Sequence, residues 1–233
     1  MRSEPVSIES VADDATRAEP SPESLYLRAD YRRQAPKAED PAGRFSLNPQ
    51  WGVYEFASRY DCERVIDVGC GGAGKTRHFF DRRDVVLVDR PAMLELVEWD
   101  GVERHGVDLE VWSPDESLCK PDTLVICADV IECLWNPLNL LSALAALWVD
   151  GCVLLLSTPD RIAMTMAGYH GAKGPPRDQK QAQLWSIPEF HRLLASVGLG
   201  GHEVLRMPSR KGSSDRITQL WILERSARPS AAE

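Results

Sequence analysis

The stretch VIDVGCGGAGKT, residues 65–76, decides the fold, because an apolar strand signal runs directly into a glycine-rich loop and then into a helix start. Its letters satisfy two phosphate-binding patterns at once. Residues 69–76 fit the P-loop pattern G-x-x-x-x-G-K-T, and residues 69–74 fit the dinucleotide pattern G-x-G-x-x-G. One loop cannot serve ligands of such different shape, so residues outside the glycines must decide what it binds.

The composition is that of a soluble globular protein. The chain has 233 residues, 43% hydrophobic and 27% charged, which is enough for one well-buried domain with an additional arm. The net charge of −8 argues against nucleic acid as a partner, since polyanion binders usually carry a basic surplus. No apolar run approaches the roughly 20 residues that cross a bilayer, and the N-terminus lacks the apolar core of a secretory signal. We therefore expect a cytoplasmic enzyme with no membrane partner.

Strand and helix signals alternate from residue 48 onward. Apolar runs predict strands at 64–68, 84–89, 123–129 and 152–157, a short strand within 103–110, and closing strands at 202–207 and 217–225. Helices are predicted at 48–60, from the glycine loop to Phe80, at 137–148 after an N-cap at Asn136, and from the S-I-P-E capping box at Ser186 to about Val197. This alternation predicts a Rossmann-like, doubly wound α/β sheet of about seven strands, mostly parallel with an antiparallel edge, and with helices on both faces.

The expected organisation is one domain with flanking segments. Residues 1–24 are rich in Ser, Glu, Asp, Ala and Pro and predict a disordered tail, and residues 25–47 predict an arm that docks on the domain. The domain covers residues 48–225, and residues 226–233 form a second tail. Within the domain, residues 159–185 make a long, polar, Gly- and Pro-rich connection, which we interpret as an inserted lid over a substrate.

Asp67 separates the possible ligands of the glycine loop. It lies at the carboxyl end of the first strand, where side chains face a bound ligand. A carboxylate about 4 Å from a phosphate of ATP or NAD costs several kcal/mol in a partly dry site. S-adenosylmethionine (SAM) carries the opposite charge, a sulfonium and an α-ammonium, so Asp67 favours SAM and opposes a polyphosphate. On this interpretation Lys75 and Thr76 have no phosphate role and are exposed residues of a first helical turn.

Two further aspartates agree with SAM. Asp89 closes the second strand, 22 residues after Asp67, where a carboxylate accepts both hydroxyls of a ribose. Asp108 follows 19 residues later, where an acidic side chain reaches the adenine amino group. A P-loop protein has no use for this set of three, although Asp129 at the end of the strand 123–129 mimics the aspartate that would hold its Mg²⁺.

Short motifs follow these aspartates in a fixed order: VIDVGCG, VDR, VDLE, ADVIECLWNP, LLLSTPDR and GPPRD…LWSIPEFHRLLASVGL. With them the chain resembles, over residues 48–225, the class I SAM-dependent methyltransferases, in particular a bacterial group related to the ubiquinone-type small-molecule O-methyltransferases. The resemblance implies that SAM is the cofactor and that the residues which bind it are Asp67, Gly69, Cys70, Gly71, Asp89, Arg90, Asp108, Leu109 and Asp129.

The same resemblance gives each part of this set a role. Residues 67–71 hold the methionine end of SAM, Asp89 binds the ribose, and residues 108–109 contact the adenine. Asp129 lies between the cofactor and the methyl acceptor. For catalysis we expect His170 as a general base in the lid, with Asp129 and Glu132 orienting the acceptor.

The chain departs from this family at several positions. Relatives carry a histidine where this chain has Cys133, and in some of them that histidine helps to bind a divalent metal, so we expect no metal here. Gln181 and Leu184 also differ from the usual residues of the lid, which predicts an altered acceptor. Trp51, Trp135 and Trp185 are candidates for an aromatic acceptor pocket.

The sequence therefore predicts a SAM-dependent methyltransferase that modifies a hydroxyl group, with an amine as the second choice, on a small molecule or sugar. Two alternatives remain open at this stage. One is a P-loop nucleotide-binding protein, motivated by G-K-T, and the other is a SAM-binding relative that has lost activity, motivated by Cys133 and the altered lid. The oligomeric state is left open.

Overall fold

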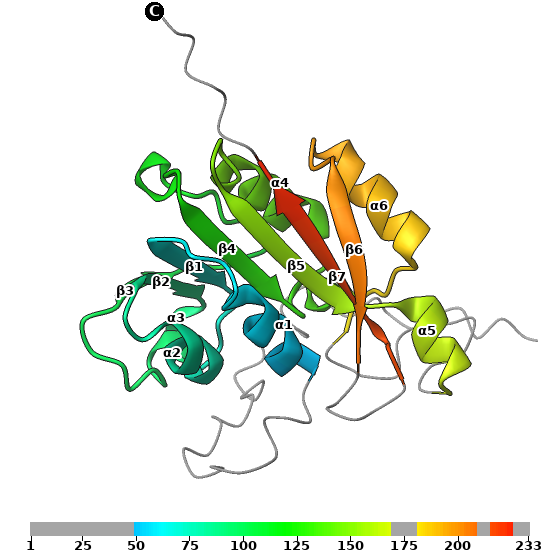
Figure 1. Cartoon of the computed structure of the whole chain (residues 1–233), viewed down its shortest axis with the longest axis horizontal. Helices are drawn as coiled ribbons and strands as arrows, with labels where there is room; N and C mark the ends of the chain where they lie inside the picture. The colour runs from blue at the N-terminus through cyan, green and yellow to red at the C-terminus, as the bar shows by residue number, and fades with distance from the viewer. Residues whose placement is uncertain (1–48, 169–180, 209–214, 226–233) are drawn as a thin grey trace, which may run out of the picture.

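A computed structural model describes residues 49–168, 181–208 and 215–225, which form one seven-stranded sheet with helices packed against it (Figure 1). The strands are β1 Arg64–Val68, β2 Asp84–Asp89, β3 Glu103–Gly106, β4 Thr123–Ala128, β5 Val153–Pro159, β6 His202–Met207 and β7 Thr218–Glu224. The helices are α1 Pro49–Ala57, α2 Gly74–Phe80, α3 Pro91–Leu94, α4 Pro137–Leu147, α5 Arg161–Met166 and α6 Ile187–Ser196, with single 3-10 turns η3 Glu116–Leu118 and η4 Ile131–Cys133.

The strand order is β3-β2-β1-β4-β5-β7-β6. The five strands from β3 to β5 pair in parallel, and four crossover connections join them along the chain. Strand β7 inserts antiparallel between β5 and β6, so that the last two strands of the chain form the antiparallel end of the sheet. The predicted mixed sheet is confirmed: the four apolar runs at 64–68, 84–89, 123–129 and 152–157 form parallel strands, and the short final link allows an antiparallel pair.

Two separate cores lie on the two faces of the sheet. Alternate residues of one strand serve different cores, as in β5, where Leu154 and Leu156 belong to one and Leu155 to the other. The first core includes Leu144 of α4 and Phe190 of α6. The second core takes its helical residues from α1, α2 and α3, and α1 crosses in front of the sheet in Figure 1. Helices therefore cover both faces, as predicted.

Helix α4 begins differently from the sequence prediction. Asn136 makes no side-chain capping bond. Instead the backbone N–H groups of Trp135 and Asn136 each donate to one oxygen of the Glu110 carboxylate, both at 2.8 Å. The predicted capping box of α6 is present, with Glu189 accepting from both the backbone N–H and the hydroxyl of Ser186.

The predicted insertion at 159–185 contains regular structure at its start. Strand β5 continues to Pro159, and α5 follows immediately after Asp160, whose side chain accepts from the N–H groups of the first helical turn. The predicted tails at 1–24 and 226–233 and the arm at 25–47 lie outside the described residues. Within the described ranges, no helix is both long and apolar enough to cross a bilayer.

Candidate functional site

Aspartates follow four neighbouring strands at the same edge of the sheet. Asp67 precedes the last residue of β1, Asp89 is the last residue of β2, Asp108 comes two residues after β3, and Asp129 comes directly after β4. Because β3, β2, β1 and β4 are adjacent and parallel, their carboxyl ends meet at one edge, which is where open α/β sheets bind ligands.

The loop after β1 requires glycine at its first position. Gly69 has φ +75°, and its N–H donates to Val88 O at 2.7 Å. A Cβ at this position would overlap the Val130 side chain, lying 2.9 Å from Cγ1 and closer still to Cγ2. The backbone of the loop therefore lies directly against the segment that follows β4. Gly71 also has a positive φ, +57°, and its N–H points back to the second strand.

Asp89 receives that bond and fastens the loop to β2. One carboxylate oxygen accepts the Gly71 N–H and the other accepts the Arg90 N–H, both at 2.7 Å. Asp89 is 6% exposed, so the two bonds are shielded from bulk water. The carboxylate thus joins the turn after β1 to the turn after β2, which are the two turns predicted to hold the methionine end and the ribose.

Asp67 lies beneath the loop rather than open to a ligand. Its side chain has no exposed surface. The Tyr54 hydroxyl lies 2.9 Å from both carboxylate oxygens and donates to them, and the Thr76 hydroxyl donates to Oδ2. This orientation follows from the alternation along β1, since Asp67 points to the same side as Val65, toward α1 and α2. The prediction that Asp67 faces the ligand directly is therefore corrected.

Burial dominates the electrostatics of Asp67. Desolvation raises the pKa of this carboxyl from 3.8 to about 6. The hydrogen bonds from Thr76 and Tyr54 and the charge of Lys75 act in the opposite direction and lower the pKa, while the charge of Asp89 raises it. Asp67 is thus a buried charge held close to the point of protonation.

Tyr54 and Thr76 were missed as site residues by the sequence analysis. Thr76 was expected on the surface, but it is fully buried, and Lys75 is half-buried with its ammonium 5.7 Å from the centre of the Tyr54 ring. The signal for Thr76 was its place in the first turn after a strand-end aspartate. Tyr54 gave no signal beyond its helical spacing to Ala57.

The turn after β3 is held by its own acidic residues. Asp108 accepts the Glu110 N–H at 3.0 Å, and Glu110 in turn holds the start of α4. Leu109 between them has no exposed surface and belongs to the first core. The Leu109 side chain is therefore not available for the predicted adenine contact, and Glu110, which the sequence analysis did not single out, is what fixes this turn.

Asp129 and Glu132 lie at the predicted boundary between cofactor and acceptor. Asp129 has φ +55°, a left-handed conformation that is uncommon for residues other than glycine, and accepts the Ser157 hydroxyl at 2.8 Å. Glu132 is 2% exposed and accepts the Thr158 hydroxyl at 3.1 Å. Hydroxyls from two successive residues of β5 thus hold the two carboxylates. His170, the predicted base, lies outside the described residues.

The main chain of Glu132 also binds the returning end of the insertion. Its carbonyl accepts the N–H of Ala182 at 2.7 Å and that of Gln183 at 3.2 Å. The Gln183 side chain donates to Trp135 O at 3.2 Å. Residues 182–183, near the returning end of the insertion, are therefore attached to the same turn that carries Glu132.

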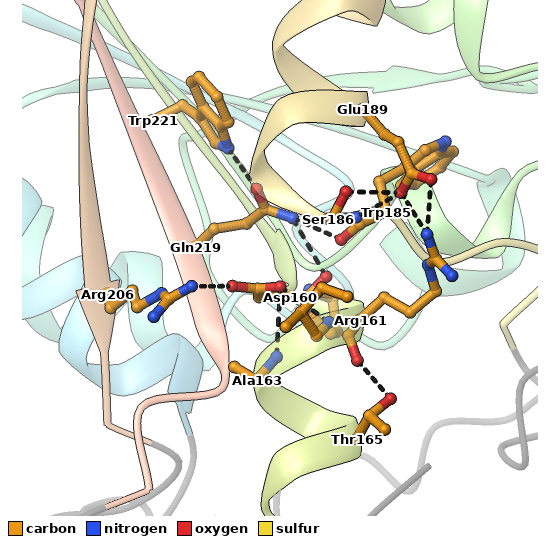
Figure 2. A network of polar contacts seen from close by, with 12 residues as sticks. Asp160, Arg161, Ala163, Thr165, Trp185, Ser186, Glu189, Arg206, Gln219 and Trp221 are labelled. Atoms are coloured by element: carbon orange, nitrogen blue, oxygen red, sulfur yellow. Dashed lines mark hydrogen bonds and ion pairs between the residues drawn. The ribbon is translucent and has the colours of Figure 1, made fainter. Parts of the chain in front are cut away.

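A polar network joins both ends of the insertion to the antiparallel end of the sheet (Figure 2). Asp160 is fully buried, and its Oδ2 accepts from Arg206 of β6 at 2.8 Å. Gln219 of β7, also fully buried, donates to Pro159 O at 3.3 Å and to Trp185 O at 3.0 Å. One amide side chain thus bonds to the first and the last residue of the predicted insertion.

A second ion pair completes this network on the side of α6. Arg161 donates to both oxygens of Glu189, at 2.5 and 2.7 Å, and its backbone N–H donates to Trp185 O at 3.0 Å. The Arg161 interaction is the main reason that the pKa of Glu189 falls from 4.5 to about 2. The ends of the insertion are therefore fixed to each other and to the sheet.

The three tryptophans proposed for an acceptor pocket do not lie together in the structure. Trp51 packs on Phe79 of α2, and Trp185 packs on Phe190 of α6 on the opposite face of the sheet. Of the three, Trp135 lies closest in sequence to the Glu132 turn. Among the described residues, no three His, Cys, Asp or Glu side chains are grouped in a way that could hold a metal ion.

The sequence matches, over residues 22–204, the family described as "Methyltransferase domain". The chain belongs to this methyltransferase family. Membership confirms the predicted Rossmann-like methyltransferase fold with SAM as its cofactor, and it overturns the P-loop alternative. The geometry agrees, because the Thr76 hydroxyl, which would bind Mg²⁺ in a P-loop, donates to the Asp67 carboxylate instead.

Solved structures of methyltransferases share this fold at low identity. The SAM-dependent methyltransferase SibL is 16% identical over 77% of this chain and 55% of its own, with a TM-score of 0.57. Human N-acetylserotonin methyltransferase in complex with SAM is 13% identical over 77% and 51%, with a TM-score of 0.51. The small RNA methyltransferase HEN1 is 15% identical over 78% and 26%, with a TM-score of 0.57. The chain thus spans about half the length of SibL and of N-acetylserotonin methyltransferase. No curated protein matches the sequence.

Proposed function

We propose that this protein transfers the methyl group of SAM to a hydroxyl group of a small molecule or sugar. The observation that carries the proposal is the row of aspartates at the ends of β3, β2, β1 and β4, around a glycine loop whose backbone is fastened by one of them. Carboxylates at this edge suit the cationic methionine end and the ribose of SAM and oppose a polyphosphate.

The residues present fit this cofactor. The turn made by Gly69, Cys70 and Gly71 brings backbone rather than bulky side chains to the edge of the sheet, as close approach of a ligand requires. Asp89 and the neighbouring Arg90 would hold the ribose. Asp108 stands at the turn that would meet the adenine, with Leu109 supporting that turn from the core.

Asp67 contributes its charge rather than a direct contact. The two carboxylates of Asp67 and Asp89 outweigh the single half-buried Lys75 and leave a net attraction for a cation placed above the loop. Such an arrangement favours the positively charged methionine end of SAM over the phosphate of a nucleotide.

The chemistry then depends mainly on alignment. Bound SAM supplies an electrophilic methyl group on a sulfonium. The protein must exclude water, bring the acceptor oxygen to about 3 Å from that methyl group, and receive the proton of the acceptor hydroxyl. We assign the orientation of the acceptor to Asp129 and Glu132, which β5 holds at the boundary, and the proton to His170.

A small acceptor is favoured over RNA by charge. The chain carries a net charge of −8, and the carboxylates of Asp129 and Glu132 would repel a phosphate backbone. The fold is shared with a small RNA methyltransferase, so the absence of a nucleic-acid partner stays a prediction that the acceptor assay must test.

Calorimetry at pH 7.5 with SAM and with Mg-ATP tests which of the two ligands the protein binds. We expect SAM to bind and ATP not to bind. Asp89→Ala should weaken the binding of SAM at least about tenfold, because it removes the hydrogen bond that holds the Gly71 turn and also the acceptor for the ribose hydroxyls. Asp81→Ala, on the exposed end of α2, is the matched control and should leave affinity unchanged.

Transfer of labelled methyl groups to a panel of phenols, sugars, amines and a short RNA tests the acceptor. Labelling of a hydroxyl compound supports the proposal. Labelling of RNA alone would replace it, and SAM binding without transfer to any acceptor class would indicate a relative that has lost activity.

A further inference from the structure

The G-K-T letters that suggested a P-loop have a different use in this structure. Thr76 and Tyr54 both donate to the buried Asp67 carboxylate, from two helices that pack on the same face of the sheet, and Lys75 covers the Tyr54 ring. These three residues come from α1 and α2, whereas Asp67 belongs to β1, so the arrangement exists only in the folded protein.

We propose that Tyr54 and Thr76 are positioning residues that hold the Asp67 carboxylate in its charged form beneath the glycine loop, so that binding of SAM is coupled to protonation of Asp67. The inference rests on the proposed function, because it needs a cationic ligand above the loop. Beyond that function, it assigns a role to Tyr54 and Thr76, which need not touch the cofactor. It also predicts that the affinity for SAM depends on pH.

The groups around Asp67 determine the sign of the coupling. Lys75 of α2 favours the charged carboxylate and Asp89 of β2 disfavours it. Cys127 in β4 is buried and Cys70 in the loop is half-buried, and desolvation raises the pKa of both thiols well above the usual value, so they stay neutral near pH 7. Asp67 is therefore the group here that changes charge near pH 6.

A cation above the loop binds better to the charged form of Asp67. Below about pH 6 the carboxyl is protonated in the free protein, and binding of SAM must then expel that proton. Affinity for SAM should be constant from about pH 7 to 7.5. Below the midpoint of the Asp67 titration, near pH 6, it should fall by up to about tenfold per pH unit.

The test is calorimetry of SAM binding to the full chain from pH 5 to 7.5, on the wild type and on two variants. Thr76→Val and Tyr54→Phe each remove a hydrogen bond that favours the charged form, which should raise the midpoint by about one pH unit. At pH 7.5 their affinities should approach that of the wild type, a convergence that a merely structural loss would not produce.

Matched controls remove equivalent groups elsewhere. Thr123→Val deletes a buried hydroxyl at the amino end of β4, away from the glycine loop. Tyr60→Phe deletes a tyrosine hydroxyl that donates to Glu224. Neither should move the midpoint. An equal loss of affinity at every pH in the Thr76 and Tyr54 variants would overturn the coupling.

Stability of the free protein gives a second readout that needs no cofactor. The pKa of Asp67 is higher in the folded chain than its ordinary value of 3.8, so the stability it contributes is complete below pH 3.8 and is lost as pH rises through about 6. Asp67→Asn should remove this part of the pH dependence of urea unfolding and also make SAM affinity independent of pH.

The two outcomes separate the inference from the proposed function. A titration seen in urea unfolding without any SAM binding would contradict the function. SAM binding whose pH dependence survives Asp67→Asn would contradict the coupling alone.

Discussion

Ser157 and Asp129 are joined by two hydrogen bonds between the ends of β5 and β4. The Ser157 hydroxyl donates to Asp129 Oδ1 at 2.8 Å, and the Asp129 N–H donates to Ser157 O at 3.0 Å. Asp129 holds a left-handed backbone conformation, φ +55°, that costs an aspartate about 1 kcal/mol. These two hydrogen bonds to β5 keep Asp129 in that conformation and fix the direction of its carboxylate.

Removal of the Ser157 hydroxyl should therefore affect turnover more than cofactor binding. We expect Ser157→Ala to lower kcat about five- to tenfold, equivalent to roughly 1 kcal/mol of lost orientation, with little change in the Kd of SAM. Ser142→Ala, which removes an exposed hydroxyl from α4, should leave both unchanged. A change in the Kd of SAM without a change in kcat would place Asp129 in cofactor binding alone.

Gly69 should tolerate no side chain. Gly69→Ala adds the strain of a positive φ to an overlap with Val130, and we expect about 2–4 kcal/mol lower stability in urea unfolding together with loss of SAM binding. Gly101→Ala has the same φ of +75° with no atom within 4 Å of the new Cβ, and should cost only about 1 kcal/mol. Equal costs for the two variants would show that the packing against Val130 is unimportant.

The buried Asp160 should be important for stability. Asp160→Asn places an amide against Arg206 and removes the only charge that pairs with it in the network, and we expect a loss of about 2–3 kcal/mol in urea unfolding. Asp150→Asn breaks the pair with Arg225, in which both side chains are at least 40% exposed, and should cost less than about 1 kcal/mol. A similar cost for both would mean that burial of Asp160 adds nothing.

Glu189 should make the protein sensitive to acid. Its pKa is lower in the folded protein, about 2 against 4.5, so the stability it contributes is present above pH 4.5 and is lost as the pH falls toward 2. In urea unfolding between pH 5 and 2.5, Glu189→Gln should show a shallower decline than the wild type. Glu95→Gln, at an exposed position after α3, should retain the wild-type decline.

Local sequence patterns were sufficient for the seven strands of the sheet, whereas the short helices α3 and α5 were not predicted. The strands 64–68, 84–89 and 202–207 were predicted with the bounds that the structure shows, because each is a short apolar or alternating run between turn residues. The capping box at Ser186 was also correct, since it depends on residues only three positions apart. The start of α4 was predicted incorrectly in its cap, because the acceptor comes from Glu110, 26 residues away.

The candidate site shows the same division. The sequence by itself determined which aspartates lie at the ends of the strands and that the loop needs glycines, because strand length and backbone conformation are local properties. Only the tertiary structure decided that Asp67 is buried under the loop with Thr76 and Tyr54, and that Gln219 joins the two ends of the insertion. These contacts depend on which helices cover each face of the sheet and on how β7 inserts beside β5, and such long-range packing leaves no periodic signal in the sequence.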